Sequence, residues 1–366
     1  MNIKTAFSVQ PDPQDAVAEI RTVLAGFDPK LIIFFASPSL PPAEVAERME
    51  AAFPTAETFG CTSAGEIVSG RLLTKSIVAM AFNRLAIKDS KVEVLEDLGK
   101  ESNRAFNAFH RHFDKPIKEM DPKQYVGIIL IDGLSRKEEL VMDKMGDLTN
   151  VTFIGGSAGD DLKFESTQVF ANGKSYSNAA VLAILEPATA ITFVKTQSFR
   201  ELPQKLTVTR ANEVTREVYE FNGKPAAVAY AEALGVSVEE APKRFMHNPV
   251  GLVIEGEPYV RSPQQIKGNT MAFYCAVPEG MELSLLESTS IIDDTAEALA
   301  KAQAELGGIS GIINFDCILR TSELIQKQLT GTYGELFMEY PTIGFSTYGE
   351  QYIGHINQSA TMLVFK

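Results

Sequence analysis

The hydrophobic pattern of the chain repeats three times. Each repeat begins with a continuous apolar run, which is typical of a strand buried on both faces. A segment with helical spacing follows, and then a glycine-rich loop and a second buried apolar run. The first runs are LIIFFA at 31–36, VGIILID at 126–132 and GIINFDC at 311–317, the helices are expected at 42–52, 136–145 and 321–329, and the second runs are expected at 76–82, 179–185 and 361–365.

The loop in each repeat carries a hydroxyl residue, any residue, a glycine and an acid. The three copies are GCTSAGE at 60–66, GGSAGD at 155–160 and GFSTYGE at 344–350. Their recurrence at equivalent places predicts an internal duplication, and the simplest interpretation is a tight turn in which the acid caps nearby amides. The alternative is a ligand site, because glycine lets a ligand approach the backbone amides at the ends of strands.

Helices that alternate with buried strands predict an α/β fold, in which repeated strand-helix-strand units form mixed sheets covered by helices. The periodicity lapses around Pro203, which places a domain boundary there. We therefore predict two domains, residues 1–199, which contain an internal duplication, and residues 200–366. Short apolar segments between 250 and 288 predict antiparallel strands, and Asn172-Gly173 predicts a hairpin.

Composition and charge argue against several classes of partner. The chain has 366 residues, of which 45% are apolar, and a net charge of −13. This charge argues against binding to nucleic acid or to an anionic membrane, because both need clustered Lys and Arg. Three cysteines without a paired short spacing predict neither a disulfide framework nor a zinc site. No apolar run approaches the ~20 residues that span a bilayer, and the N-terminal segment lacks a signal-peptide pattern, so we expect a cytoplasmic protein without membrane insertion.

The third loop differs from the other two and is the candidate binding site. Tyr348 stands where the other copies have alanine, and Arg320 and His355 accompany only this copy. Arg320 presents a planar fork that suits a carboxylate or phosphate, whereas the alternative is a surface ion pair with Glu350 or Glu323. The residues expected to face the ligand are Arg320, Tyr348, Glu350, His355 and Asn357, and the secondary candidates in the other loops are Cys61, Ser63, Glu66, Ser157 and Asp160.

Two further chemistries are open. Gly155–Gly159 matches the G-x-S-x-G pattern of a nucleophile elbow, but a polar segment follows and no histidine lies downstream in a triad context. A hydrolase that uses Ser157 or Cys61 is therefore an alternative, although a buried cysteine more often serves as a small apolar residue. His247 and His355 are candidate ligands of a metal or of haem iron, although a lone histidine more often has a structural role.

Residue patterns in both halves of the chain resemble the FIST family. FGCTSAGEI and IGGSAGDD resemble its N-terminal domain, whereas VTREVYEFNGKPA, FDCILR and GFSTYGEQYIGHINQSATM resemble its C-terminal domain. In this order the motifs cover nearly the whole chain. The resemblance implies a sensory module of signal transduction that binds small, amino-acid-like ligands, and some family members are haem proteins that sense nitric oxide and regulate a histidine kinase.

Carried over by position, the resemblance adds Cys317 and Phe345 to the candidate ligand residues. The spacing of His355 and Asn357 departs from the adjacent His-Asn associated with the family, which weakens His355 as an inherited ligand. We therefore expect a non-enzymatic sensor that needs no cofactor, binds a small polar ligand and signals to a separate protein such as a histidine kinase or a cyclase. The alternatives are a haem-based nitric-oxide sensor, with His247 and His355 as ligands, and the serine or cysteine hydrolase.

Overall fold

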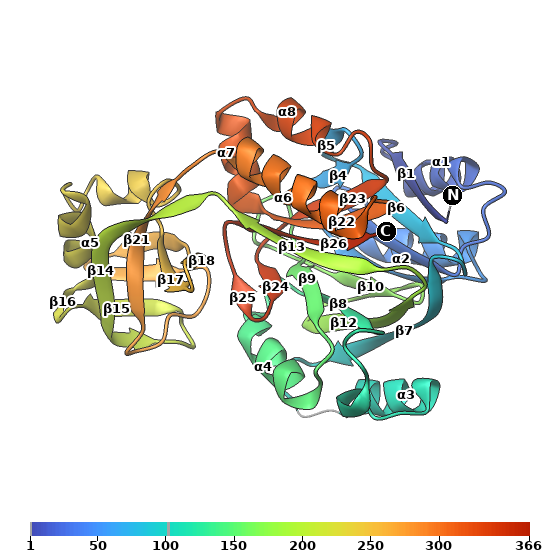
Figure 1. The fold of residues 1–366 in the computed structure, drawn as a ribbon, viewed down its shortest axis with the longest axis horizontal. Helices are drawn as coiled ribbons and strands as arrows, with labels where there is room; N and C mark the ends of the chain where they lie inside the picture. The colour runs from blue at the N-terminus through green and yellow to red at the C-terminus, as the bar shows by residue number, and fades with distance from the viewer. Residues whose placement is uncertain (1, 101–102) are drawn as a thin grey trace. The chain divides into compact units, whose positions relative to one another are not determined.

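The computed structural model describes residues 2–100 and 103–366 and confirms the predicted fold class, a mixed α/β architecture of sheets covered by helices (Figure 1). The chain forms two compact units. Unit 1 comprises the chain up to Lys195 together with Ala296–His355 and Ala360–Lys366, and unit 2 comprises Thr196–Thr295 and Ile356–Ser359. Both predicted ranges, 1–199 and 200–366, contribute to unit 1, so the compact units divide the chain differently. The division of the sequence into domains at residues 199 and 200 stays a prediction.

Unit 1 is built on three six-stranded sheets in which equivalent strands follow the same order. The first sheet runs β1 (Ile3–Ser8), β6 (Ile77–Phe82), β2 (Leu31–Ala36), β3 (Glu57–Thr62), β10 (Val169–Ala171), β11 (Lys174–Tyr176). The second runs β7 (Ile87–Glu96), β12 (Ala179–Pro187), β8 (Val126–Ile131), β9 (Phe153–Ser157), β24 (Glu350–Tyr352), β25 (His355–Ile356). The third runs β13 (Ile191–Gln197), β26 (Ser359–Phe365), β22 (Gly311–Cys317), β23 (Thr342–Thr347), β4 (Glu66–Val68), β5 (Arg71–Leu73).

The three sheets exchange hairpins in a cycle. In each sheet the central strand pairs in parallel with the strand that ends in a glycine loop, as β2 with β3, β8 with β9 and β22 with β23. The hairpin that follows each loop then leaves its own sheet. Hairpin β4–β5 joins the third sheet, β10–β11 joins the first and β24–β25 joins the second. Each sheet is therefore completed by a hairpin from another part of the chain. This equivalence agrees with the predicted duplication, whose evolutionary origin stays a prediction.

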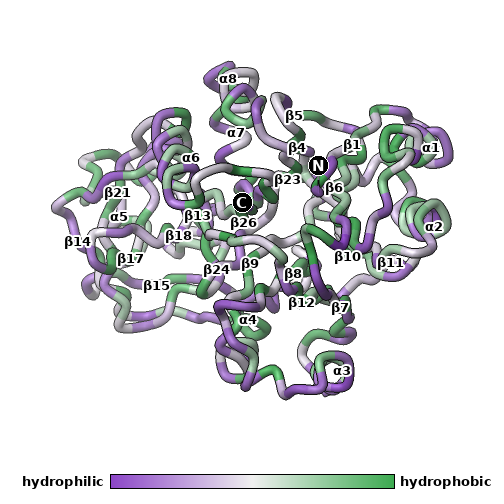
Figure 2. Tube along the Cα trace, turned by 45° about the vertical axis from the view of Figure 1, so that its right-hand side comes forward, coloured by the Kyte–Doolittle hydropathy of each residue, from purple (hydrophilic) through white to green (hydrophobic). Residues whose placement is uncertain are grey.

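Helices cover the outer faces of the sheets. Apolar residues of α1 (Pro13–Val23) and α2 (Pro42–Ala52) pack on the first sheet, and those of α3 (Arg104–Phe113) and α4 (Glu138–Leu148) pack on the second. In Figure 2 hydrophobic and hydrophilic residues alternate along α1 and α2, as expected for helices that bury one side. The remaining helices of the third segment are α6 (Ile291–Leu306), α7 (Ile318–Gln326) and α8 (Thr330–Glu335), and a 3₁₀ turn, η1, spans Ile117–Glu119.

The inner faces of the three sheets share one apolar core. Phe35 of the first sheet lies 4.5 Å, between ring centroids, from Phe345 of the third, and Leu130 of the second sheet belongs to the same buried cluster. Side chains of a strand alternate between its faces, so the same strands supply this core and the helix-covered outer layers. This double burial explains why their sequences are continuous apolar runs.

Unit 2 is an antiparallel sheet with one α-helix, which confirms the predicted antiparallel strands between 250 and 288. Its sheet runs β18 (Glu257–Arg261), β17 (Val250–Ile254), β21 (Glu282–Ser288), β14 (Phe199–Asn212), β15 (Glu217–Phe221), β20 (Thr270–Phe273), β19 (Pro263–Lys267), with β16 (Lys224–Pro225) paired to β15. Helix α5 (Ala226–Leu234) ends at Gly235, whose φ of 68° lies in the left-handed region, and a 3₁₀ turn, η2, spans Ala241–Arg244.

Most of unit 2 interrupts the third segment of unit 1. In the first two segments the edge strand leads directly to a covering helix, from β1 to α1 and from β7 to α3. In the third segment the strands of unit 2 lie between edge strand β13 and helix α6. Unit 2 is therefore an insertion at one of three equivalent connections, which explains why unit 1 is discontinuous in sequence.

One glycine in each loop strand is required by close approach to the neighbouring strand. A Cβ atom at Gly60 would lie 1.8 Å from the carbonyl oxygen of Phe34, and one at Gly155 would lie 1.7 Å from that of Ile129. At Gly344 the corresponding distance, to the carbonyl oxygen of Asn314, is 2.2 Å. No backbone shift confined to one residue relieves contacts this short, so these positions need glycine.

Substitution of one of these strand glycines should destabilise the fold strongly. We expect Gly155→Ala to lower the free energy of unfolding by about 3 kcal/mol, because the added methyl group overpacks against backbone. The matched control is Gly331→Ala in α8, where nothing lies within 4 Å of the added Cβ and alanine favours the helix by about 1 kcal/mol. Urea unfolding measures both, and equal stability of Gly155→Ala and wild type would contradict this explanation.

Candidate functional site

The three glycine loops bond to one another through their backbones in a closed ring. In each bond, an amide of one loop donates to a carbonyl of the next. The bonds are Ala64 N to Ser346 O at 3.1 Å, Gly159 N to Thr62 O at 3.0 Å, and Tyr348 N to Ser157 O at 3.1 Å. These amides are therefore committed to the architecture, which favours the interpretation of the loops as turns over that of backbone ligand sites.

The first loop holds a buried carboxyl group. Ser63 Oγ donates to Glu66 Oε1, and Ser76 donates to Glu66 Oε2 from its hydroxyl at 2.6 Å and from its amide at 3.1 Å. Burial raises the pKa of Glu66 to about 7, although the hydrogen bonds from Ser63 and Ser76 oppose it. Ser63 and Glu66 thus bond within their own loop and hairpin.

The acid of the second loop caps its own chain. The carboxylate of Asp160 accepts hydrogen bonds from the amides of Phe164 (2.9 Å), Glu165 (2.7 Å) and Ser166 (2.9 Å). Burial by itself raises the pKa of Asp160, but hydrogen bonds from Tyr348 and from these amides outweigh it and hold the pKa below its ordinary value. This geometry is the predicted capping by the loop acid.

The structure brings Tyr348 of the third loop to the second loop. Its hydroxyl donates to the Asp160 carboxylate and accepts from the amide of Leu162 at 2.8 Å. Its ring stacks on Phe164 with centroids 5.0 Å apart. The tyrosine that replaces alanine at this position therefore anchors the segment after the second loop.

Arg320, on the first turn of α7, forms a buried ion pair. Its Nε donates to Asp316 Oδ1 at 2.8 Å, and the two side chains are 2% and 0% exposed. Tyr333 also donates to Asp316, at 3.1 Å. Burial by itself lowers the pKa of Arg320, but the Asp316 carboxylate outweighs it and holds the pKa above its ordinary value. The predicted position at the surface is wrong, because Arg320 is buried and pairs with Asp316, four residues earlier in β22. Glu323, one of the two predicted partners, pairs instead with Lys327 at 2.6 Å.

A chain of buried polar side chains links α4 to the hairpin after the third loop. Ser157 Oγ donates to Glu138 Oε1 at 3.1 Å and accepts from Gln351 Nε2 at 3.1 Å. Gln351 Nε2 also lies 3.1 Å from His355 Nδ1. The carboxamide oxygen Gln351 Oε1 makes no hydrogen bond with any residue that the structure describes, although the side chain is 0% exposed.

The position of Gln351 is apolar in the other two sheets. Gln351 is the residue that pairs with the strand glycine Gly155 across β24 and β9. Its equivalents are Ile67, opposite Gly344, and Phe170, opposite Gly60. All three side chains are at most 1% exposed. A buried amide therefore replaces a hydrocarbon at one of three equivalent positions.

The remaining predicted residues have separate surroundings. Cys61 and Phe345 lie in the shared core of unit 1, and burial raises the pKa of the Cys61 thiol well above its ordinary value. Cys317 is 1% exposed at the end of β22, and Glu350 is 0% exposed at the start of β24. Asn357 is 1% exposed, and neither polar atom of its carboxamide bonds to a described residue.

The surroundings of Ser157 and His355 do not fit the hydrolase and haem alternatives. The hydroxyl of Ser157 bonds to the carboxylate of Glu138 and the carboxamide of Gln351. A nucleophile elbow requires a helix directly after the serine, and residues 158–168 form none. The ring of His355 packs over Gly349, where a Cβ would lie 2.1 Å from its Cε1. Within the described residues, unit 1 has cavities of about 290, 420, 510 and 530 Å³, and none of these four is lined by histidine. They do not fit haem ligation by His355 or His247, and haem binding stays a prediction.

Residues 2–100 and 103–366 contain no group of three or more His, Cys, Asp or Glu side chains arranged to hold a metal ion. Over the same part of the chain, no helix combines the length and apolar character needed to cross a bilayer.

Sequence reasoning missed the partners of several predicted residues. Asp316 was detectable, because a carboxylate at the end of an apolar strand, four residues before an arginine, predicts an ion pair. Glu138 and Gln351 gave no such signal. They lie far apart in sequence, and only the exchange of hairpins between sheets brings Gln351 to Ser157.

Comparisons with known proteins identify two matching family models. The model described as the FIST N domain matches residues 30–224, and the model described as the FIST C domain matches residues 226–353. An uncharacterized protein of Methanocaldococcus jannaschii is 23% identical over 282 residues, which are 70% of this chain and 54% of that relative. The chain therefore spans about half the length of the relative. A solved structure, cyanuric acid hydrolase from A. caulinodans, aligns with 76% of this chain and 99% of its own at 11% identity and a TM-score of 0.21, too low to support an argument.

The buried carboxyl of Glu66 should make stability depend on pH. Its pKa is raised in the folded protein, so its contribution is fully present below the unfolded pKa of about 4.5 and is lost as the pH rises through about 7. A difference of about 2.5 in pKa corresponds to about 3 kcal/mol. We expect Glu66→Gln to remove this decrease in the free energy of unfolding. The exposed Glu255→Gln is the control and should keep it, and parallel pH curves for Glu66→Gln and wild type would exclude Glu66 as the cause.

Removal of Arg320 should be far more costly than removal of a surface arginine. Arg320→Met leaves the Asp316 carboxylate buried without its cation, and we expect a loss of about 3–5 kcal/mol in unfolding free energy. The control Arg200→Met breaks the exposed pair with Glu287 and should cost no more than about 1 kcal/mol. The double variant Asp316→Asn/Arg320→Met should recover part of the loss, and equal costs at both arginines would contradict the buried pair.

Proposed function

This chain belongs to the FIST family, and on that premise we propose that it is a non-enzymatic sensor that binds a small polar ligand at the hairpin after the third glycine loop. FIST domains are associated with sensing in signal transduction. The proposal adds a location, the strand β24 that carries Gln351, and a ligand class, small molecules with an ammonium or amide donor such as amino acids. Output would pass to a separate signalling protein, such as a histidine kinase or a cyclase.

The observation that carries the proposal is the buried carboxamide of Gln351. A buried acceptor without a hydrogen bond costs about 1–3 kcal/mol, so an apolar residue at this position would give a more stable fold. The equivalent positions in the other sheets are occupied by isoleucine and phenylalanine. A ligand N–H that reaches Gln351 Oε1 would offset the cost, and natural proteins retain such costs where function requires them.

Neighbouring groups support a polar ligand. Ser157 Oγ and His355 Nδ1 hold the Gln351 amide nitrogen, so the orientation of the carboxamide is set and its oxygen is the acceptor presented. The carboxylate of Glu138 at the far end of the chain adds negative charge near the site. Both features favour a ligand group that donates hydrogen bonds or carries positive charge over an anionic one.

A thermal-shift screen of amino acids and small carboxylates tests the proposal. At a concentration of 100 Kd a ligand stabilises the folded state by about 2.7 kcal/mol, which gives a measurable rise in Tm. We expect Gln351→Met to remove the shift caused by any hit while the variant stays folded, since methionine has a similar volume and leaves no unpaired acceptor. The matched control is Gln168→Met, which also removes a buried carboxamide oxygen that makes no hydrogen bond to a described residue.

Each outcome of this screen bears on a different part of the proposal. A hit whose shift survives in Gln351→Met removes this hairpin as the site. A panel in which no amino acid shifts Tm at millimolar concentration refutes the ligand class, and a shift caused by carboxylates alone would contradict the preference for a hydrogen-bond donor. Loss of the shift in both glutamine variants would show a general effect of the substitution.

A further inference from the structure

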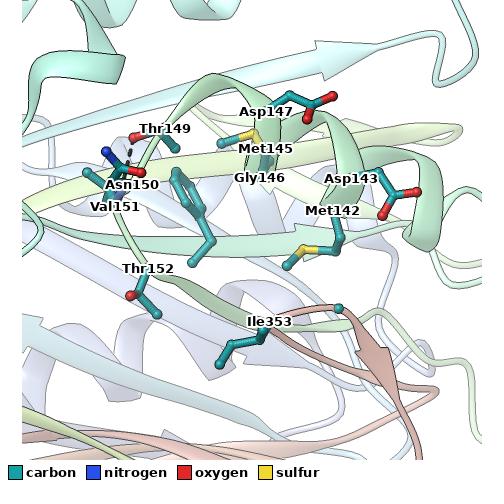
Figure 3. A pocket seen from close by; sticks show the side chains of 12 residues that line it. Met142, Asp143, Met145, Gly146, Asp147, Thr149, Asn150, Val151, Thr152 and Ile353 are labelled. Atoms are coloured by element: carbon teal, nitrogen blue, oxygen red, sulfur yellow. Dashed lines mark hydrogen bonds between the residues drawn. The ribbon is translucent and has the colours of Figure 1, made fainter.

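The space between α4 and the β24–β25 hairpin holds a cavity of about 510 Å³ (Figure 3). This volume lies within the range of about 300–1,000 Å³ that small-molecule sites occupy. Met142 and Met145 of α4 and Phe153 of β9 form its apolar wall, and Ile353 and Gly354 of the hairpin turn face them. Figure 3 shows the Met142 side chain pointing from the helix toward Ile353.

In the other two sheets, a helix lies against the turn of the exchanged hairpin. In the first sheet, a Cβ added at Gly173 of the hairpin turn would lie 3.1 Å from Glu50 Cβ on α2. In the third sheet, a Cβ added at Gly334 of α8 would lie 2.7 Å from the carbonyl oxygen of Gly70 in the hairpin turn. Helix and hairpin touch directly in both cases. The open space between α4 and the β24–β25 hairpin therefore differs from the direct contact of helix and hairpin in the other two sheets.

Isoleucine is an unfavourable residue for the backbone conformation and exposure of position 353. Its φ is 57° and its side chain is 74% exposed. A β-branched residue is strained at positive φ, and the equivalent turn of the β10–β11 hairpin uses Asn172, at a φ of 52°, followed by glycine. An exposed isoleucine in a strained conformation, on the rim of a cavity, is accounted for if its hydrocarbon contacts a ligand there.

The lining determines the class of ligand. Methionine, phenylalanine and isoleucine side chains suit a hydrocarbon body, and methionine adapts to its shape. Asp143 and Asp147 lie on the rim, together with the C-terminal end of α4, where helix carbonyls carry partial negative charge. The twelve lining residues include neither lysine nor arginine. We propose that this cavity binds a small amphiphilic cation, an ammonium group carried on an apolar body, with the body against Met142 and Ile353 and the ammonium at the rim.

Two hydrogen bonds join α4 to the hairpin through residues that do not line the cavity. Glu138 on the first turn of α4 accepts from Ser157, and Ser157 accepts from Gln351 of the hairpin, both at 3.1 Å. These bonds fix the separation of helix and hairpin beside the cavity, so closure would require breaking them. The proposed site is thus preformed, and its contacts at Ile353 are distinct from the polar ligand site proposed at Gln351.

Calorimetric titration with n-hexylammonium tests the proposal on the full chain. We expect binding at least about tenfold tighter than that of hexanoate, which has the same apolar body and the opposite charge, and tighter than that of neutral hexanol. Ile353→Asn should weaken hexylammonium binding about tenfold, since it removes the apolar wall, while its Tm stays equal to wild type or rises because asparagine fits the turn. Loss of affinity in this variant is then not a consequence of misfolding.

Two controls separate the contributions. Val214→Asn replaces an equally β-branched residue, 85% exposed in unit 2, and should leave binding unchanged. Asp143→Asn/Asp147→Asn should reduce the preference for hexylammonium over hexanol. No binding of hexylammonium at millimolar concentration, unchanged affinity in Ile353→Asn, or equal affinities for the cation and the anion would each overturn the proposal. None of these results depends on the amino-acid screen of Gln351→Met, so the two proposals fail separately.

Discussion

The structure of unit 1 depends on the ring of backbone hydrogen bonds that joins its three glycine loops. Each loop donates an amide to the next, and each then sends its hairpin into a sheet that it did not begin. No sheet is complete without a hairpin from elsewhere in the chain, so the unpaired edge of every loop strand is covered only when all three segments are folded. Close contact at the ring also explains the loop glycine Gly159, where an added Cβ would lie 2.8 Å from Ala64 N. Turn chemistry, strand pairing and the shared core are thus consequences of one arrangement.

Because of this arrangement, the boundary between the two family models does not coincide with the boundaries of the two compact units. The FIST N model ends at residue 224 and the FIST C model begins at residue 226, within the antiparallel sheet of unit 2. Unit 1 takes two segments from the first match and one from the second. The ring requires three segments, so the part matched by the N-terminal model cannot complete unit 1 without β22 and β23, which the other model matches, and β26, which follows that match. The two family models therefore describe successive stretches of sequence, and the physical unit of folding crosses the boundary between them.

Much of the fold could be predicted from the sequence, because strands buried on both faces leave an unmistakable pattern. LIIFFA, VGIILI and GIINFDC are strands, and a helix follows each of them as predicted. The hairpin exchange could not be predicted, since strands of three residues specify no partner beyond their own turn. The candidate site shows the same limit. The ion pair of Arg320 with Asp316, four residues away, was detectable from the sequence, whereas the contact between Ser157 and Gln351 joins residues 194 apart. Local sequence patterns predict the helices and strands, but they do not predict which sheet each hairpin joins or which residues it contacts there.

Two residues of the β24–β25 hairpin, Gln351 and Ile353, differ in kind from the residues at equivalent positions in the other hairpins. Gln351 replaces a hydrocarbon in the buried strand, and Ile353 replaces a turn residue suited to positive φ. Both substitutions lower stability by known mechanisms, loss of a hydrogen bond to a buried acceptor and backbone strain. Both also lie against the same helix, because Glu138 on the first turn of α4 joins the chain to Gln351 and Met142 one turn later faces Ile353. The ring fixes the base of the hairpin, whereas its turn at Ile353 is exposed. Under the two proposals, a ligand at either position would therefore contact an element that is fixed at one end and exposed at the other.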